Sequence, residues 1–425
     1  MAYQEDPLSF GNRVRAMMYG IAFGDALGAT VEKLTAAQIR ERYGRVESLD
    51  TPWWRMNLSD KERKGRIRGG GIYTDDTLMT LCLLQVYREQ RRHLDPWDMA
   101  DCMVRQIAWT PRWISELQCE TMLLERLFFA EKWLFQKHQL SSCDPRTGGI
   151  GNMVNCGAAM YIAPIGAVNA GDPQAAYNEA IAFASAHQES YGLEAAGVLA
   201  AAVAAAFVPG TTIEAVVAEA LRLAKDGTKL AIAAVVEAVP GLRGKSHAKV
   251  TAAFHDAIAP FSYTGDDIHH ISAKVGRLTA AYTPSRLHSI EELPIALGFA
   301  LLNNGDFAKS VPDGINSGRD TDSIGVMVGA ILGALNGLGV IDPQVCGKIN
   351  EVNKVDLLAE ADSFAKVALG IQDADRRSFE AVLRSRDGFT NGVTNRHANG
   401  DTDGLTDGHR HDANGVNVVK PVNEN

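Results

Sequence analysis

The chain has 425 residues, of which 46% are hydrophobic and 22% are charged, and its formal net charge is −9. This composition is that of a folded globular protein, and the length allows one large domain or several ordinary ones. The acidic balance argues against a nucleic-acid partner, because proteins that bind nucleic acids usually present a basic face.

Cysteine usage and the apolar segments indicate the compartment. The six cysteines lie far apart with no C-x-x-C pair, which is typical of a reducing compartment. The N-terminal residues lack the basic and apolar stretches of a secretory signal. The apolar segments 193–209 and 324–341 have the length of membrane spans, but the first is mostly alanine and the second carries a glycine at every fourth position. Such small residues favour close helix packing, so we expect a cytoplasmic protein without a membrane partner.

Helical periodicity of the apolar residues runs through most of the sequence, and strand patterns are nearly absent. The predicted helices span residues 12–32, 76–92, 97–108, 115–138, 173–186, 192–208, 212–225, 228–238, 246–258, 265–280, 288–303, 324–337 and 343–369. This pattern predicts an all-α fold of many helices.

Two segments depart from the helical pattern. Residues 35–71 contain paired tryptophans, a run of charges and three consecutive glycines, and they are predicted to form a long loop that could cover a site. From residue 386 onward the chain is rich in Asn, Gly, Asp, Thr and His. Such a segment buries too little apolar surface to offset the entropy of ordering. We therefore predict a single domain over residues 1–385 and a disordered polar tail over 386–425.

The first segment that suggests chemistry is T-D-D-T at residues 74–77, which follows three glycines and opens an apolar helix. Asp and Thr are good helix N-caps, so capping alone is one interpretation. One cap, however, needs only one side chain. Two adjacent carboxylates flanked by hydroxyls supply the oxygens that a hard cation binds.

A second segment of the same design, S-G-R-D-T-D-S at residues 317–323, directly precedes a helix of small residues. The two segments together offer six candidate ligands: Thr74, Asp75, Asp76, Asp320, Asp322 and Ser323. Carboxylates gathered without cations would repel one another, and two divalent ions with one bridging aspartate would remove that repulsion. Because the set has no His or Cys pair at zinc spacing, Mg²⁺ or Mn²⁺ fits better than Zn²⁺.

The first predicted helix contributes a third segment. Gly20, Gly24 and Gly28 recur every four residues, which suggests close approach of a backbone or a ligand. Asp25 and Glu32 are seven residues apart and would project from nearly the same face of a continuous helix. Close packing explains the glycines, but it does not explain two acids beside an apolar stripe.

These segments in this order, G-x-x-x-G-D-A-L-G-x-x-x-E, T-D-D-T and G-R-D-T-D-S, resemble the ADP-ribosylglycohydrolase family. The segment N-C-G-A-A-M-Y-I-A-P-I-G at residues 155–166 is similar to the family's N-G-A-A-M-R-I-A-P-I-G. The resemblance covers residues 12–340. It implies an orthogonal all-α multi-helix bundle with a binuclear Mg²⁺ or Mn²⁺ centre.

The resemblance also implies roles for individual residues. Thr74, Asp75 and Asp76 would bind one ion, Asp320 and Ser323 the other, and Asp322 would bridge them. The catalytic residues would be Glu32, Asp25 as a positioning acid, and Asp322. The substrate-binding residues would be Asn155, Gly157, Ala158, Tyr161, His187 and Gly318.

Two positions depart from the family pattern. Tyr161 stands where the family usually has an arginine, and Cys156 precedes the glycine of the same segment. The contacts that such an arginine makes to phosphate or ribose are then missing. His187 follows an alanine rather than the usual threonine, and a lone histidine at a helix end is more often structural than catalytic.

We therefore predict a hydrolase that cleaves the ribosyl C1 bond of an ADP-ribosylated protein side chain or a related ADP-ribosyl compound through an oxocarbenium-like state. The alternatives are a glycohydrolase of a small ribosyl metabolite or nucleoside, an all-α phosphohydrolase, and a non-catalytic metal-binding relative. A further tract, D-D-I-H-H at residues 266–270, is interpreted as a helix cap rather than a metal site.

Overall fold

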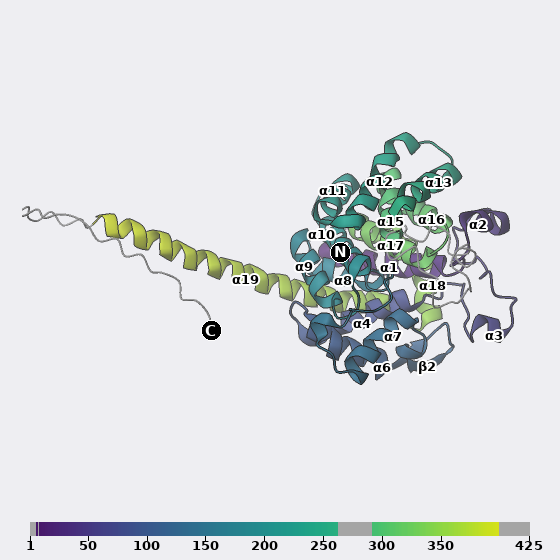
Figure 1. The fold of residues 1–425 in the computed structure, drawn as a ribbon, viewed down its shortest axis with the longest axis horizontal. Helices are drawn as coiled ribbons and strands as arrows, with labels where there is room; N and C mark the ends of the chain where they lie inside the picture. The colour runs from purple at the N-terminus through teal and green to yellow at the C-terminus, as the bar shows by residue number, and fades with distance from the viewer. Residues whose placement is uncertain (1–5, 7, 262–290, 399–425) are drawn as a thin grey trace, which may run out of the picture. The chain divides into compact units, whose positions relative to one another are not determined.

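The computed structural model describes residues 6, 8–261 and 291–398 (Figure 1). It contains two units, Met1–Asp373 and Ala374–Asn425. The helices are α1 (Phe10–Gly28), α2 (Ala36–Tyr43), α3 (Asp60–Arg63), α4 (Asp75–Gln90), α5 (Pro96–Asp98), α6 (Val104–Ala108), α7 (Phe129–Phe135), α8 (Ala163–Val168), α9 (Pro173–Ala184), α10 (Ser190–Ala206), α11 (Ile213–Leu223), α12 (Asp226–Leu242), α13 (His247–Ile258), α15 (Glu292–Leu302), α16 (Phe307–Asn316), α17 (Thr321–Asn336), α18 (Pro343–Asn353) and α19 (Leu357–Ala398).

Strands are confined to one short hairpin in the described part of the chain. β1 (Pro111–Ile114) pairs antiparallel with β2 (Cys119–Met122), and Ile114 lies opposite Cys119. The rest of the ordered secondary structure is helical, so the predicted all-α fold class is confirmed.

The glycine stripes of α1 and α17 determine the centre of the first unit, where the two helices lie together (Figure 1). A Cβ added at Gly24 would lie 2.1 Å from the backbone oxygen of Gly325, and one at Gly20 would lie 2.2 Å from that of Gly329. Only glycine allows backbones to approach so closely. The pairing is antiparallel, so the C-terminal end of α1 meets the N-terminal end of α17. The hydroxyl of Thr321 donates a hydrogen bond of 2.7 Å to the carbonyl of Gly28 at this junction.

One predicted helix, residues 115–138, is wrong in its first half, which contains the turn of the hairpin and β2. Gln118 there has a positive φ of 53°, which a helix does not accommodate. The adjacent Glu116 is fully buried and forms ion pairs with Arg68 and Arg126. The local sequence pattern favoured a helix here, but the chain forms a hairpin instead, and Glu116 beside it pairs with both arginines.

Other boundaries also differ from the predictions. The predicted helix 343–369 is two helices, because Lys354 between α18 and α19 has a left-handed conformation with a φ of 50°. The predicted loop 35–71 contains α2 and α3, and the backbone N–H of Trp54 donates to the carbonyl of Thr30 at 3.2 Å. The predicted helix 265–280 and the 266–270 tract lie outside the described residues.

The predicted start of the tail at residue 386 falls inside α19, which continues to Ala398. The compact first unit ends at Asp373. The long apolar segments that imitate membrane spans correspond to α10 and α17, whose side chains are almost all buried in the protein core. Within the described ranges, no helix combines the length and apolarity that crossing a membrane requires.

Candidate metal centre

The start of α4 is capped by a residue from another helix. Three glycines with positive φ, at residues 69–71, turn the chain so that Thr74 becomes the N-cap of α4. The Thr74 side chain makes no capping hydrogen bond. Instead, the buried carboxylate of Asp25 accepts the backbone N–H of Thr74 at 2.9 Å, the N–H of Thr77 at 3.0 Å and the Thr77 hydroxyl at 2.6 Å. Asp25 therefore satisfies the donors that a helix start leaves unpaired.

This arrangement bears on the capping interpretation of the T-D-D-T segment. Because Asp25 supplies the cap, the side chains of Asp75 and Asp76 are not used for it. The start of α17 is similar, since its N-cap Asp320 makes no side-chain capping bond either. Simple capping is therefore not what the carboxylates of these two segments do.

We expect the replacement of Asp25 by alanine to lower the free energy of unfolding by about 3 kcal/mol, because buried donors lose a charged acceptor. Urea denaturation in the presence of a chelator measures this effect without a contribution from bound metal. Thr212→Ala is the control, since Thr212 caps α11 with its own hydroxyl and an ordinary cap is worth about 1 kcal/mol. Equal losses in the two variants would mean that Asp25 is no more than an ordinary cap.

Backbone pairing between two loops brings the third segment to the other two. The N–H of Lys33 donates to the carbonyl of Arg319 at 2.8 Å, and the N–H of Arg319 donates to the carbonyl of Leu34 at 2.6 Å. α1 ends at Gly28, so the predicted continuous helix through Glu32 does not form. The loop pairing nevertheless places Glu32 at the start of α17, next to the acids Asp320 and Asp322.

Several of the predicted metal ligands lie close together at this junction. The hydroxyl of Ser323 donates to the carboxylate of Asp76 at 3.1 Å, which links the starts of α17 and α4. Carboxylate oxygens of Glu32, Asp320 and Asp322 all lie within 4.8 Å of one another. This is an oxygen-rich cluster contributed by three segments that are far apart in the sequence.

The electrostatics of the cluster suit a bound cation. Burial, followed by repulsion from neighbouring acids, raises the pKa values of Asp76 and Asp322 well above their usual range. Burial together with Glu292 and Glu32 raises the pKa of Asp320 to about 8. Carboxylates that destabilise one another in this way are stabilised by a divalent ion at their centre. The donor set therefore fits the metal centre that the family resemblance implies.

Two buried arginines hold the acids at the edge of the cluster in place. Arg68 contacts Glu32 at 2.5 Å and Glu116 at 2.7 Å. Arg126 contacts Asp75 at 2.5 Å and also pairs with Glu116. Glu116 thereby joins the two arginines, and through them it fixes the positions of Glu32 and Asp75. We call these five residues the ion-pair network.

Sequence reasoning missed the basic half of this network. Arg68 stood in a run of charges that was interpreted as a loop, and Arg126 and Glu116 lay inside a predicted helix. Ion pairs between residues that are 48 apart, as in Arg68 and Glu116, leave no local pattern. The one available signal was the position of Arg68 directly before the three glycines that lead to α4.

The charge state of Glu32 follows from these contacts. Burial acts to raise the pKa of Glu32, but Lys33 and Arg68 outweigh it and hold that pKa well below the usual range. Glu32 is therefore a carboxylate at neutral pH.

The six predicted substrate-binding residues are all buried. The hydroxyl of Tyr161 and Nδ1 of His187 form a hydrogen bond of 2.8 Å within the core, and burial lowers the pKa of His187 to about 3. Gly318 packs against the backbone of residues 34–36, where a Cβ would lie 2.5 Å from the nitrogen of Ala36. Tyr161, His187 and Gly318 are thus each used in internal packing, and a substrate contact by any of them stays a prediction. Ala158 is likewise fully buried.

Asn155 and Gly157 form a small buried cluster with Glu131, which the sequence did not single out. The amide of Asn155 donates to Glu131 at 3.1 Å, and its oxygen accepts the N–H of Gly157 at 3.0 Å and the side chain of Gln188 at 2.8 Å. A Cβ on Gly157 would overlap Glu131, at 1.9 Å from its oxygen. Burial raises the pKa of Glu131 to about 7. A substrate contact by Asn155 or Gly157 stays a prediction.

Comparison with known proteins gives a consistent result. The profile of the ADP-ribosylglycohydrolase family matches residues 6–375. YegU of Escherichia coli K12 is 24% identical over 363 residues, which cover 83% of this chain and 96% of that protein. A protein of Archaeoglobus fulgidus is 27% identical over 330 residues, covering 76% of this chain and 87% of that protein.

A solved structure described as an ADP-ribosylglycohydrolase-related protein complex has the same fold. Its TM-score is 0.50 at 20% sequence identity, and the match covers 84% of this chain and 99% of that one. The family match extends over most of the compact first unit and includes every segment that contributes to the candidate metal centre. The chain therefore belongs to the ADP-ribosylglycohydrolase family.

Proposed function

We propose that this protein is a divalent-cation-dependent glycohydrolase that cleaves the ribosyl C1 bond of ADP-ribosylated protein side chains or of a related ADP-ribosyl compound. One observation carries the proposal. The starts of α4 and α17 present carboxylates that no capping bond uses, and a hydrogen bond from Ser323 to Asp76 joins the two starts beside Asp320 and Asp322. Membership of the ADP-ribosylglycohydrolase family supports the same class of reaction.

The proposed ligands divide between the two helix starts. Thr74, Asp75 and Asp76 would hold one Mg²⁺ or Mn²⁺ ion, and Asp320, Asp322 and Ser323 would hold the other. Such ions, when bound, orient ribose hydroxyls and lower the pKa of a coordinated water. The chemistry of the donor set supports this assignment, because hard oxygen ligands suit these metals.

Protein side chains supply the remaining functions. Glu32, kept ionised by its ion pair with Arg68, is suited to accept a proton from the attacking water. The negative charge of the cluster would also stabilise the positive charge that develops on the ribose ring during bond cleavage. Asp25 acts as a positioning residue, because it fixes the start of α4 rather than facing the reacting atoms.

We expect the replacement of Asp322 by asparagine to lower kcat/KM by about a hundredfold or more. Loss of a residue that only hydrogen-bonds to a metal ligand can already cost about a hundredfold, and loss of the ligand itself should cost no less. The assay is release of ADP-ribose from ADP-ribosyl-arginine and ADP-ribosyl-serine substrates, with Mg²⁺ or Mn²⁺ and with a chelator. Asp362→Asn is the matched control, because Asp362 pairs with Arg15 in a partly exposed ion pair and should leave the activity unchanged.

Each result of this assay has a distinct meaning. Metal-dependent release that disappears in Asp322→Asn supports the proposal, and the preferred substrate identifies the linkage. Release of free phosphate would indicate a phosphohydrolase instead. Metal binding by the wild type without turnover of any ribosyl substrate would indicate a non-catalytic relative.

The contacts of Tyr161 favour a second candidate, a glycohydrolase of a small ribosyl metabolite or nucleoside. At the position where the family usually has an arginine, the hydroxyl of Tyr161 is paired with His187 in the core. A neutral buried side chain cannot form an ion pair with a diphosphate. Turnover of nucleosides without turnover of ADP-ribosyl substrates would select this candidate.

A further inference from the structure

Cys156 lies beside the metal centre rather than in the apolar core. Its thiol donates to the carboxylate of Asp320 at 3.1 Å and to the hydroxyl of Ser323 at 3.4 Å. Both of these partners belong to the second ligand segment. A buried cysteine that serves only packing would have apolar neighbours at its sulfur, whereas the Cys156 thiol donates to two oxygen acceptors.

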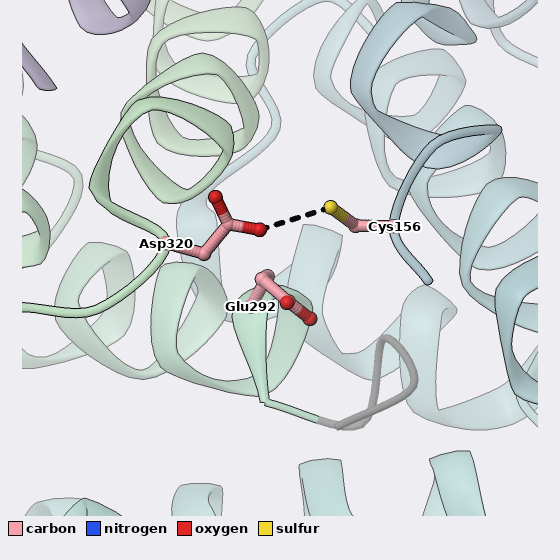
Figure 2. Close-up of side chains that lie close together, drawn as sticks. All are labelled: Cys156, Glu292 and Asp320. Atoms are coloured by element: carbon pink, nitrogen blue, oxygen red, sulfur yellow. Dashed lines mark hydrogen bonds between the residues drawn. The ribbon is translucent and has the colours of Figure 1, made fainter. Parts of the chain in front are cut away.

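Glu292 completes a group of three different side chains. A thiol sulfur from Cys156 and carboxylate oxygens from Glu292 and Asp320 all lie within 4.8 Å of one another. Figure 2 shows the thiol of Cys156 and the carboxylate of Asp320 pointing toward each other, with Glu292 beside them. The three residues come from separate places in the fold, namely the loop before the 3₁₀ turn Ala159–Tyr161, the first residue of α15 and the N-cap of α17.

The spacing of the three donors is close to that of a metal site. Sulfur and oxygen ligands at about 2.3 and 2.1 Å from one tetrahedral ion lie roughly 3.6 Å apart. The observed contact of 3.1 Å between Cys156 and Asp320 is near this value. Small side-chain rotations would move the Glu292 carboxylate to a similar distance from the other two donors. The buried carboxylate of Glu292 and the half-buried carboxylate of Asp320 also repel one another, and a cation between them would reduce that repulsion.

We propose that Cys156, Glu292 and Asp320 form a mixed sulfur–oxygen site for a divalent transition-metal ion of the zinc class. The site shares Asp320 with the centre proposed above, but it does not depend on hydrolase activity. On binding, the thiol loses its proton to solvent and the thiolate becomes a ligand. Three protein ligands leave a fourth position of a tetrahedral ion open.

The sulfur changes which metals this side of the centre prefers. Oxygen ligands alone favour Mg²⁺ and Mn²⁺, whereas a thiolate adds affinity for Zn²⁺ and Co²⁺. An ion bound by Cys156, Glu292 and Asp320 would therefore differ in kind from an ion held by oxygen ligands alone.

Cobalt tests the proposal directly, because a thiolate bound to Co²⁺ absorbs in the near ultraviolet. The experiment uses full-length protein freed of metal with a chelator, then titrated with Co²⁺ and, separately, with Zn²⁺. We expect a charge-transfer band in the wild type and in the control Cys346→Ser, and its loss in Cys156→Ser. The affinity of Cys156→Ser for Zn²⁺ should fall at least about tenfold, while its affinity for Mg²⁺ stays within about threefold.

Glu292→Gln keeps the proposal testable if Cys156→Ser fails to fold. This variant should keep the charge-transfer band of each bound cobalt ion but bind Zn²⁺ about tenfold more weakly. Absence of the band in the wild type, or its survival in a folded Cys156→Ser, would overturn the mixed site. Neither result contradicts the hydrolase proposal. That proposal depends on whether Asp322→Asn abolishes the release of ADP-ribose with Mg²⁺ or Mn²⁺.

Discussion

Replacing Gly24 with alanine is expected to lower the free energy of unfolding by about 3 kcal/mol or more, at the upper end of what overpacking costs. The added methyl would lie 2.1 Å from the backbone oxygen of Gly325 and 2.2 Å from its carbonyl carbon. Neither atom belongs to a side chain that can rotate away, so α1 and α17 must separate. Because this helix pair sets the distance between Glu32 and Asp320, affinity for the divalent ion should fall together with stability.

The control for Gly24→Ala is the same substitution at Gly347, which is also helical but has no neighbouring atom within 4 Å of the added methyl. Alanine is the better helix former, so Gly347→Ala should raise stability by about 0.5–1 kcal/mol. Urea denaturation of both variants and the wild type measures the two effects. If the two substitutions change stability in the same direction, the close approach of α1 and α17 does not hold the fold together.

Replacing Glu116 with glutamine is expected to lower the free energy of unfolding by about 3–5 kcal/mol, because removing one partner leaves buried charges uncompensated. Glu116 is fully buried, and both Arg68 and Arg126 contact its carboxylate. Once those arginines lose their shared partner, Glu32 and Asp75 are also less firmly oriented. Weaker Mn²⁺ binding should therefore accompany the loss of stability.

The pH dependence of the Glu116 variant provides a second test. Burial acts to raise the pKa of Glu116, but Arg126 and Arg68 outweigh it, and the pKa lies below its ordinary value of 4.5. A lowered pKa in the folded state means that the stabilisation is complete above about pH 4.5 and is lost as the pH falls through the folded-state pKa. The difference between wild type and Glu116→Gln should accordingly shrink in acid.

Glu219→Gln is the matched control for the network, since Glu219 pairs with Arg222 at the surface of α11. Exposed pairs contribute about 0–1 kcal/mol, so this variant should unfold almost like the wild type at every pH. If Glu116→Gln lowers the free energy of unfolding by no more than Glu219→Gln does, the ion-pair network does not stabilise the fold around the metal centre.

The sequence was informative wherever a short segment by itself limits what the backbone can do. Glycines at every fourth position in both α1 and α17 predicted a close helix contact, and the structure pairs Gly20 with Gly329 and Gly24 with Gly325. The predicted ligands Asp76, Asp320, Asp322 and Ser323 lie together because each stands at a helix start. Periodicity predicted most of the helices, since each one has to bury a single apolar face.

The same reasoning did not work for residues whose partners are distant in the sequence. The cap that Asp25 provides for α4, the burial of Glu116 between two arginines and the contact of Cys156 with Asp320 each join separate segments. Tyr161 and His187 matched positions of a family motif, yet their mutual hydrogen bond places both in the core.

The sequence by itself therefore determined the all-α class, the family and the two aspartate-rich helix starts, because periodicity, glycine spacing and motif order are local properties. Only the tertiary structure decided which acid caps a helix and which acids remain available to a metal ion. It also decided which arginines and which thiol lie next to those acids. These outcomes depend on distances between residues far apart in the chain, and such distances are fixed by how the helices pack.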